Sequence, residues 1–495
     1  MAAPGADATP LYQRLYAQLR EHILSGALPA GSRLPSARTL AADLTLSRNT
    51  VEAALAQLRA EGFIERRIGS GTVVAATMPD TAPFGRIRPA ARARTEAAAA
   101  TRVRPKPGRL SSRGAAIRDA GRAELEADAI VGAWATDLEA FPRAAWRRLL
   151  TRRAREAGTA TLEAADAAGL PALRRAIAEH VRLTRGVRCD VEQVVVVSST
   201  QQAIDLASRL VLDPGDLAVV EEPQYACARG ALLASGATLA GVPVDADGIV
   251  ASALEAYRDA RLLYVTPSHQ FPLGVTMSLA RRLAILSWAA ATGAWILEDD
   301  YDSEFRYDGR PLAALQGLDT ADRVIYVGSF NKSLFPGLRL AYVVAPPTLA
   351  PAVAAARRIA DGSSPPLLQA TLADFLAAGH YAAHLRQARR FYANCRDALK
   401  REVEAHWGGR VRVGPADAGL HLVVHLPRGT DDVAVARAAG GHGLGVGALS
   451  RYYLASRAPR GLLLSYGAAS PEVIVRAVAA LAPLVRRATA GTTRA

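Results

Sequence analysis

The chain has 495 residues, half of them hydrophobic, which is enough for about three globular domains. No apolar run approaches the ~20 residues that a membrane helix needs, and the N-terminus lacks the basic and apolar regions of a signal peptide. Three widely spaced cysteines form neither a disulfide framework nor a metal motif, so we expect a cytoplasmic protein without a metal site or membrane. The net charge of +14 favours a polyanionic partner, although the prevalence of arginine over lysine also fits the bias of a GC-rich genome.

Residues 10–77 are patterned as three helices and a hairpin. Ser36 and Ser47 are suited to cap the second and third helices, which only Thr45 and Leu46 separate, and this short junction is typical of a helix-turn-helix. Residues 63–74, with Gly-Ser-Gly in their middle, indicate a two-stranded wing. The apolar positions expected to face inward are Tyr12, Leu15, Leu19, Ile23 and Leu24, then Leu40 and Leu44, then Val51, Ala54, Leu55 and Leu58.

Polar residues of this module lie where DNA contacts are needed, at the start of the third helix and around the wing. A three-helix domain that binds a protein is the alternative. The stretches LPSARTLAADL, LSRNTVEAALAQLRAEGFI and RIGSGTVV resemble the GntR-type winged helix-turn-helix, although Thr45 stands where that family often has glycine. The predicted DNA-binding residues are Arg38, Ser47, Arg48, Asn49, Thr50, Arg66, Arg67 and Gly69.

Residues 78–125 are predicted to form a linker, because Ala, Arg and Pro dominate and no apolar period is sustained. Eleven basic and three acidic residues lie between positions 78 and 122. This charge is either simply solvated or adds salt-dependent, sequence-independent affinity for DNA.

From residue 126 onward, short apolar runs alternate with amphipathic helices such as 279–291. The runs at 194–197, 217–220, 262–265, 295–297 and 324–327 are predicted strands. This alternation indicates an α/β domain over 126–370, with a parallel sheet that is covered on both faces and binds ligands at the carboxyl ends of its strands. A helical run over 372–403 and short strands near 420–426 and 462–464 predict a smaller α+β domain over 371–490.

Lysine is scarce, so chemistry that needs an amine has few places to occur. Lys106 falls in the linker and Lys400 on a surface-like helix, whereas Lys332 follows a predicted buried strand. A lysine at the carboxyl end of a strand can form a Schiff base with an aldehyde cofactor such as pyridoxal 5'-phosphate (PLP).

The other groups that PLP needs have candidates near strand ends. Asp299 can pair with the pyridine nitrogen, Tyr301 can hydrogen-bond the phenolic oxygen, and Tyr225 can stack on the ring. Ser199, Thr200 and Gln201 precede or open a helix, whose N-terminus favours phosphate, while Ser329 and Arg339 can complete that phosphate site. His269 or Gln270 is also expected to approach the cofactor.

Residues 130–480 resemble the fold-type I PLP-dependent aminotransferases. More narrowly, TPSHQFPLGVTMS, EDDYDSEFRYDGRPL and GSFNKSLFPGLRL resemble the MocR group, in which a GntR-type α+β domain precedes an aminotransferase-like domain. The resemblance implies a multidomain transcription regulator that forms a head-to-tail homodimer on double-stranded DNA with repeated half-sites. It also implies an effector, either PLP alone or PLP with a small amine, and control of vitamin B6 or amino-acid metabolism.

Three positions depart from the aminotransferase pattern. Ala164 stands where a tyrosine usually reaches the phosphate bound by the partner subunit, and Ser199 replaces a glycine of the phosphate loop. Leu463 stands near the usual arginine that holds a substrate carboxylate, and Arg460 is expected to face away. The missing arginine favours a sensor over the alternative of an active aminotransferase with an accessory DNA-binding domain. The changes at Ala164 and Ser199 suggest a third alternative, a scaffold that no longer binds PLP.

Overall fold

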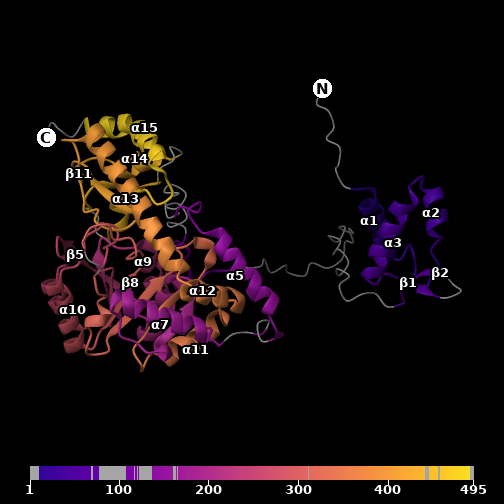
Figure 1. The fold of residues 1–495 in the computed structure, drawn as a ribbon, viewed down its shortest axis with the longest axis horizontal. Helices are drawn as coiled ribbons and strands as arrows, with labels where there is room; N and C mark the ends of the chain where they lie inside the picture. The colour runs from indigo at the N-terminus through magenta and orange to yellow at the C-terminus, as the bar shows by residue number, and fades with distance from the viewer. Residues whose placement is uncertain are drawn as a thin grey trace, which may run out of the picture. The chain divides into compact units, whose positions relative to one another are not determined.

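The computed structural model describes residues 10–67, 71–76, 108–115, 117–119, 121, 136–159, 163, 166–309, 312–440, 445–454 and 458–490. The chain divides into two compact units, Met1–Lys106 and Pro107–Ala495, which are treated separately below (Figure 1). Among the described residues, no helix is both long and apolar enough to cross a membrane.

The first unit has the predicted three helices and hairpin. Helices α1 (Leu11–Leu24), α2 (Ala37–Asp43) and α3 (Arg48–Ala60) precede strands β1 (Ile64–Arg67) and β2 (Gly71–Val74), which pair antiparallel. The expected core residues of α3 are all buried, as are Leu15, Leu19 and Ile23. The inward placement expected for Leu24 and Leu44 is wrong: both are exposed, because each lies at the last turn or the C-cap of its helix, past the packed face.

Both predicted caps of the helix-turn-helix are present. The Ser36 hydroxyl accepts a hydrogen bond from the Thr39 amide, and the Ser47 hydroxyl accepts one from the Thr50 amide. Thr45, in the turn between the two helices, has a φ of 55°. That left-handed conformation is the one that glycine adopts without steric penalty, so the side chain at position 45 strains the turn.

An eight-stranded sheet forms the centre of the second unit, with the order β3-β10-β9-β8-β7-β4-β5-β6. The parallel arrangement expected from sequence holds for the five neighbouring strands β5, β4, β7, β8 and β9. At the two sides of these strands, β6 runs antiparallel to β5, and β10 runs antiparallel to both β3 and β9. No helix separates β9 from β10, so the crossover that makes neighbouring strands parallel is missing there. The strands are β3 (Val194–Val197), β4 (Leu217–Glu222), β5 (Thr238–Asp245), β6 (Gly248–Ile249), β7 (Leu262–Val265), β8 (Trp295–Asp300), β9 (Val324–Ser329) and β10 (Ala341–Val344).

Helices cover both faces of this sheet, as expected. Alternate residues of β3 show this: Val195 and Val197 pack with residues of α8, α9 and α11, whereas Val194 and Val196 pack with α7, α12 and α13. The helices are α5 (Arg143–Glu156), α7 (Pro171–Arg185), α8 (Thr200–Val211), α9 (Ala226–Ser235), α10 (Leu279–Thr292), α11 (Ala350–Asp361), α12 (Pro366–Ala377) and α13 (His380–Trp407), with short 3-10 turns at Val191–Gln193, Ala251–Tyr257, Gln316–Leu318 and Pro336–Leu338.

The smaller α+β part is built on a four-stranded antiparallel sheet of order β11-β12-β14-β13. The helical run expected over 372–403 is two helices, because Gly379, with a φ of 72°, ends one and starts the other. Helix α13 then extends from the large sheet to the small one, where α14 and α15 lie (Figure 1). The elements are β11 (Arg412–Val413), β12 (His421–His425), α14 (Asp432–Ala438), β13 (Gly445–Ala448), a 3-10 turn at Leu449–Tyr452, β14 (Gly461–Ser465) and α15 (Pro471–Ala490).

Candidate functional site

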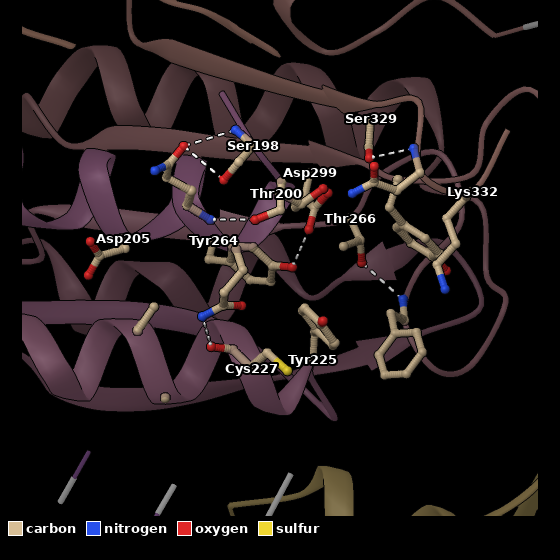
Figure 2. A pocket seen from close by; sticks show the side chains of 18 of the residues that line it. Ser198, Thr200, Asp205, Tyr225, Cys227, Tyr264, Thr266, Asp299, Ser329 and Lys332 are labelled. Carbon is tan, nitrogen blue, oxygen red and sulfur yellow. Dashed lines mark hydrogen bonds between the residues drawn. The ribbon is translucent and has the colours of Figure 1, made fainter. Parts of the chain in front are cut away.

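A cavity of about 1110 Å³ opens at the carboxyl ends of β3, β8 and β9 (Figure 2). Parallel strands present their carboxyl ends at one edge of the sheet, so side chains that follow different strands meet there. Nine of the ten residues predicted to bind the cofactor line this cavity: Ser199, Thr200, Gln201, Tyr225, Asp299, Tyr301, Ser329, Lys332 and Arg339.

Lys332 reaches the cavity from the loop that follows β9. Ser329, the last residue of that strand, shapes the loop, because its hydroxyl accepts a hydrogen bond of 3.1 Å from the Asn331 amide. Lys106 lies outside the described residues, and Lys400 is exposed on α13. Lys332 is therefore the lysine whose amine the described structure brings to this cavity.

Asp299 lines the cavity, and only one of its two carboxylate oxygens accepts a hydrogen bond from the described residues. It is 3% exposed, and its Oδ2 accepts a 2.8 Å hydrogen bond from the Tyr264 hydroxyl. Its Oδ1 is buried without a hydrogen-bond partner among the described residues. Burial raises the pKa of Asp299 to about 7, against the lowering effect of the Tyr264 bond, and Asp300 and Asp302 add to the rise. A buried carboxylate oxygen of this kind fits a protonated ring nitrogen.

The cavity also offers groups that fit a phosphate. Ser199 caps α8, with its hydroxyl accepting from the Gln202 amide at 3.1 Å, so the free amides of the first turn of that helix lie at the cavity wall. Arg339 supplies a cation at the same cavity from a left-handed backbone conformation, with a φ of 54°. The Gln201 side chain is held away from the helix axis by a 2.9 Å bond to the Cys227 carbonyl.

Aromatic side chains also line the cavity. Tyr225 and Phe271 both line the cavity and contact each other edge to face, with their ring centroids 5.5 Å apart. Tyr301 lines the same cavity, and its ring packs edge to face on Phe271 as well. Planar surfaces of this kind fit a planar heterocycle.

His269 and Gln270 do not line the cavity. His269 lies behind Tyr301, with its Nδ1 2.9 Å from the Tyr301 hydroxyl oxygen. Gln270 is buried, and its amide donates to the carbonyls of Pro223 and Phe271. Sequence reasoning also missed Tyr264, Thr266, Phe271 and Asn331 as lining residues; the rule that strand ends bind ligands would have indicated Thr266, which directly follows β7.

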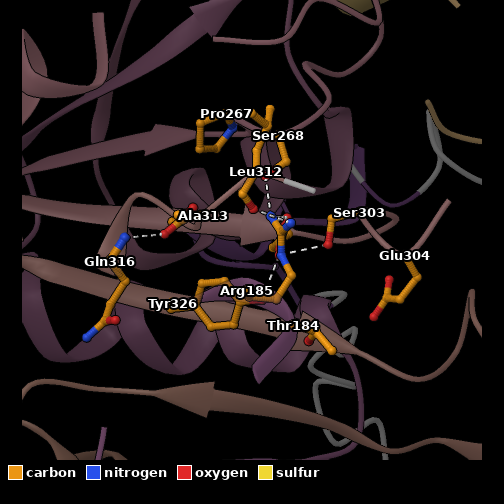
Figure 3. A network of polar contacts seen from close by, with 12 residues as sticks. Thr184, Arg185, Pro267, Ser268, Ser303, Glu304, Leu312, Ala313, Gln316 and Tyr326 are labelled. Atoms are coloured by element: carbon orange, nitrogen blue, oxygen red, sulfur yellow. Dashed lines mark hydrogen bonds and ion pairs between the residues drawn. The ribbon is translucent and has the colours of Figure 1, made fainter. Parts of the chain in front are cut away.

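A buried ion pair joins Arg185, at the end of α7, to Asp300, at the end of β8, within the polar network around Arg185 (Figure 3). Arg185, at the end of α7, donates to both carboxylate oxygens of Asp300 at 2.7 and 3.1 Å and to the Ser268 hydroxyl at 2.7 Å. The Tyr326 hydroxyl also donates to Asp300, at 2.6 Å. Although burial opposes ionisation, Arg185 and these hydrogen bonds keep the pKa of Asp300 below its ordinary value. Asp300 thus stays ionised beside Asp299.

Two of the three departures from the aminotransferase pattern, Ser199 and Leu463, lie among the described residues, and Ser199 is the cap of α8. Leu463 is fully buried on β14 and packs in an apolar cluster with Phe271, Leu449 and Tyr452, so an apolar side chain occupies that position. Arg460 pairs with Asp432 at 3.3 Å. Ala164 lies outside the described residues.

In the first unit, the predicted DNA-binding residues fall into three groups. Arg38, Arg48, Asn49 and Arg66 have exposed side chains. Ser47 and Thr50 hydrogen-bond each other's hydroxyls at 2.7 Å as part of the helix cap. The Arg67 side chain and Gly69 lie outside the described residues. Sequence reasoning missed Arg33, which bridges to Val73 and whose guanidinium lies against Gly71 of the wing.

Comparison with known proteins defines the class to which these two units belong. Residues 11–74 match the family model of the bacterial regulatory proteins of the gntR family, and residues 135–458 match that of aminotransferase class I and II. The large unit has the fold of LysN, the α-aminoadipate aminotransferase of Thermus thermophilus solved with N-(5'-phosphopyridoxyl)-L-leucine, at a TM-score of 0.68 and 28% identity over 75% of this chain and 97% of that one. The protein is thus a helix-turn-helix regulator joined to an aminotransferase domain of the PLP-dependent fold.

Whole-length relatives narrow this class. The chain is 40% identical to the probable rhizopine catabolism regulatory protein MocR of Rhizobium meliloti, over 94% of this chain and 92% of the relative. It is 31% identical to the pyridoxine biosynthesis transcriptional regulator PdxR of Corynebacterium glutamicum, over 94% of each. The chain belongs to the MocR-type transcription regulators, which confirms the resemblance and the fold class predicted from sequence.

Proposed function

We propose that the large unit binds PLP through a Schiff base with Lys332, and that PLP, alone or with a small amine, is the effector that changes DNA binding. The observation that carries this proposal is the cavity that joins Lys332 to the unpartnered Oδ1 of Asp299. Bound PLP would supply an aldehyde carbon to the amine and an electron-withdrawing pyridinium ring.

Each part of the cavity has a role in this proposal. Asp299 holds the ring nitrogen, Tyr301 hydrogen-bonds the phenolic oxygen, and Tyr225 stacks on the ring. Phosphate is held by the first turn of α8, with Ser199, Thr200 and Gln201, and by Ser329 and Arg339. Burial, and then the carboxylates of Asp302 and Asp299, keep the pKa of Tyr301 well above its ordinary value, so its phenol is a neutral donor.

The first described segment of the second unit supports an effector role. Within residues 112–121, the described part is helical, and Ile117 and Gly121 line the cavity. A ligand that contacts Ile117 and Gly121 has one affinity for the conformation in which this segment lies at the cavity, and a different affinity for a conformation in which the segment has left it. Such a difference in affinity is what shifts a conformational population.

For DNA binding, we propose that α3 enters the major groove with Arg48 and Asn49. Contacts to the DNA phosphate backbone come from Arg38 and from the wing residues Arg66, Arg67 and Gly69. A head-to-tail homodimer in the cytoplasm would place two such modules on repeated half-sites. We also propose that the protein controls a vitamin B6 pathway, because its relative PdxR is a transcriptional regulator of pyridoxine biosynthesis.

The decisive experiment measures affinity for DNA from upstream of the protein's own gene, at fixed salt, with and without PLP. We expect PLP to change the affinity of the wild type and of Lys400→Ala, and to leave Lys332→Ala unaffected. Borohydride, which reduces a Schiff base to a stable amine, would trap PLP on the wild type and not on Lys332→Ala. Specific DNA binding that ignores PLP in the wild type would refute the effector role, and absence of a reducible adduct would refute the Schiff base.

The same protein sample tests the competing enzymatic reading. An active aminotransferase converts its bound PLP to pyridoxamine phosphate when it meets a suitable amino acid. We expect no such conversion across a broad amino-acid panel, because the buried, apolar Leu463 supplies no cation to orient the α-carboxylate.

A further inference from the structure

Three buried polar side chains form a cluster directly behind Tyr301. His269 follows β7, Asp302 follows β8, and His421 begins β12 of the small sheet; all three are at most 3% exposed. Their potential ligand atoms lie within 4.8 Å of one another. None of the roles proposed above for the cavity residues uses this cluster. The three side chains therefore have a role of their own to fill.

Hydrogen-bond chemistry fixes the proton on His269. Its Nδ1 lies 3.0 Å from Asp302 Oδ2 and 2.9 Å from the Tyr301 hydroxyl oxygen. A carboxylate oxygen accepts hydrogen bonds, so the contact with Asp302 favours the tautomer of His269 that carries its hydrogen on Nδ1. The Tyr301 hydroxyl thus lies in contact with both His269 and Asp302, and these two side chains hold it in place beside the cavity that Tyr301 lines.

The far side of His269 contacts the small sheet and the loop before it. The centroids of the His269 and His421 rings lie 4.9 Å apart. His421 Nε2 donates a hydrogen bond of 3.2 Å to the Pro272 carbonyl. Gly419 lies so close that a Cβ there would overlap the His269 ring. The Gly419 carbonyl is itself fixed, because it accepts from the hydroxyls of Tyr307 at 2.6 Å and Tyr466 at 2.8 Å.

We propose that His269 is a positioning residue that aims the Tyr301 hydroxyl at the cofactor and ties Tyr301 to the small domain at Gly419 and His421. It acts through Tyr301 and does not touch the cofactor. Through these contacts, occupancy of the cavity changes the order of the Gly419–His421 segment. This inference rests on the proposed binding of PLP, and its test separates the two.

The test compares two substitutions at His269 in the full-length protein. His269→Asn keeps an N–H donor near the Nδ1 position, whereas His269→Leu removes it. We expect His269→Leu to weaken PLP binding about tenfold, as the loss of one hydrogen bond to a polar group does, and to shift the absorbance of bound PLP. His269→Asn should restore most of both. His425→Leu, four residues after His421 on the same strand, is the matched control and should leave both unchanged.

A double-mutant cycle with Tyr301→Phe asks whether His269 acts through Tyr301. If it does, His269→Leu has little further effect on PLP affinity once Tyr301 is Phe. If the two substitutions instead lower PLP affinity independently, so that their effects multiply, the positioning role is overturned. His269→Ala, which also removes the N–H donor, gives the same comparison if His269→Leu is poorly folded.

Hydrogen exchange measures the link to the small domain. PLP should slow exchange of amides around Gly419–His421 in the wild type and in His269→Asn, and not in His269→Leu. Wild-type protein that fails to bind PLP refutes the proposed function, whereas binding without this protection refutes only the link. One metal ion per chain in the purified wild type, lost in both His269→Leu and His421→Leu, would also overturn the proposal, because the cluster would then be a metal site.

Discussion

Adjacent carboxylates at the end of β8 have opposite electrostatic environments. Asp300 has the Arg185 guanidinium at 2.7 Å, whereas among the described residues Asp299 has the Tyr264 hydroxyl on Oδ2 and no hydrogen-bond partner on Oδ1. A polar group left unsatisfied in the interior destabilises the empty protein. We infer that Asp299 is retained for its ligand, at the expense of stability.

Asp299→Asn tests this trade between stability and binding. Because the pKa of Asp299 is raised from 3.8 to about 7, the folded protein binds a proton more readily than the unfolded chain. Its contribution to stability is therefore present below pH 3.8 and lost as the pH rises through about 7. We expect PLP-free Asp299→Asn to be more stable than wild type above that pH, by up to about 4 kcal/mol, and to bind PLP more weakly. Urea unfolding at several pH values measures the difference in stability. If the free energy of unfolding changes equally with pH in both proteins, the prediction is contradicted.

Arg185→Met removes the cation and leaves Asp300 charged and buried. Breaking a buried ion pair from one side destabilises by about 3–5 kcal/mol, so we expect a loss of that size in the free energy of unfolding. Arg185→Met with Asp300→Asn should recover much of it, since the uncompensated charge is gone. No recovery in the double variant would show that packing of the arginine, rather than its charge, carries the effect.

Sequence reasoning located the side chains that follow strands, because the chain direction alone places Lys332 and Asp299 at one sheet edge. It could not place His269 behind Tyr301 or find the Tyr264–Asp299 bond. Those contacts depend on the path of the loop after β7 and on the approach of the small sheet. Neither has a local sequence signal.

At the scale of elements, four-residue apolar runs sufficed to predict β3 and β7 with their observed bounds. β5 was missed because only one of its eight residues is fully buried, and β10 because no helix separates it from β9. Alternation of strands and helices predicts parallel pairing only where a helix intervenes. The expected run over 372–403 failed for a local reason, the left-handed Gly379.

Strain in the helix-turn-helix gives a prediction at this scale. Thr45→Gly should stabilise the first unit by about 1 kcal/mol, because glycine adopts a φ of 55° without the Cβ clash. Its greater freedom in the unfolded chain offsets part of that gain. Thr45→Ala, which keeps the Cβ, is the control and should show no such gain. Hydrogen exchange of the α2 and α3 amides reports the difference, and faster exchange in Thr45→Gly would contradict the assignment of strain.

For the whole molecule, the question is whether both wings of a dimer engage DNA at once. Each phosphate neutralised by a basic side chain adds about 0.9 to the slope of log affinity against log salt. Arg66 is exposed on β1, and a dimer on two half-sites presents two copies. We therefore expect Arg66→Ala to make the salt dependence less steep. The magnitude of the slope should fall by about 2 on DNA with two half-sites and by about 1 on DNA with one. Arg59→Ala, an exposed arginine at the far end of α3, is the matched control and should change neither slope. A decrease of about 1 on both DNAs would mean that a single wing binds, and the proposed head-to-tail dimer on repeated half-sites would then have to be abandoned.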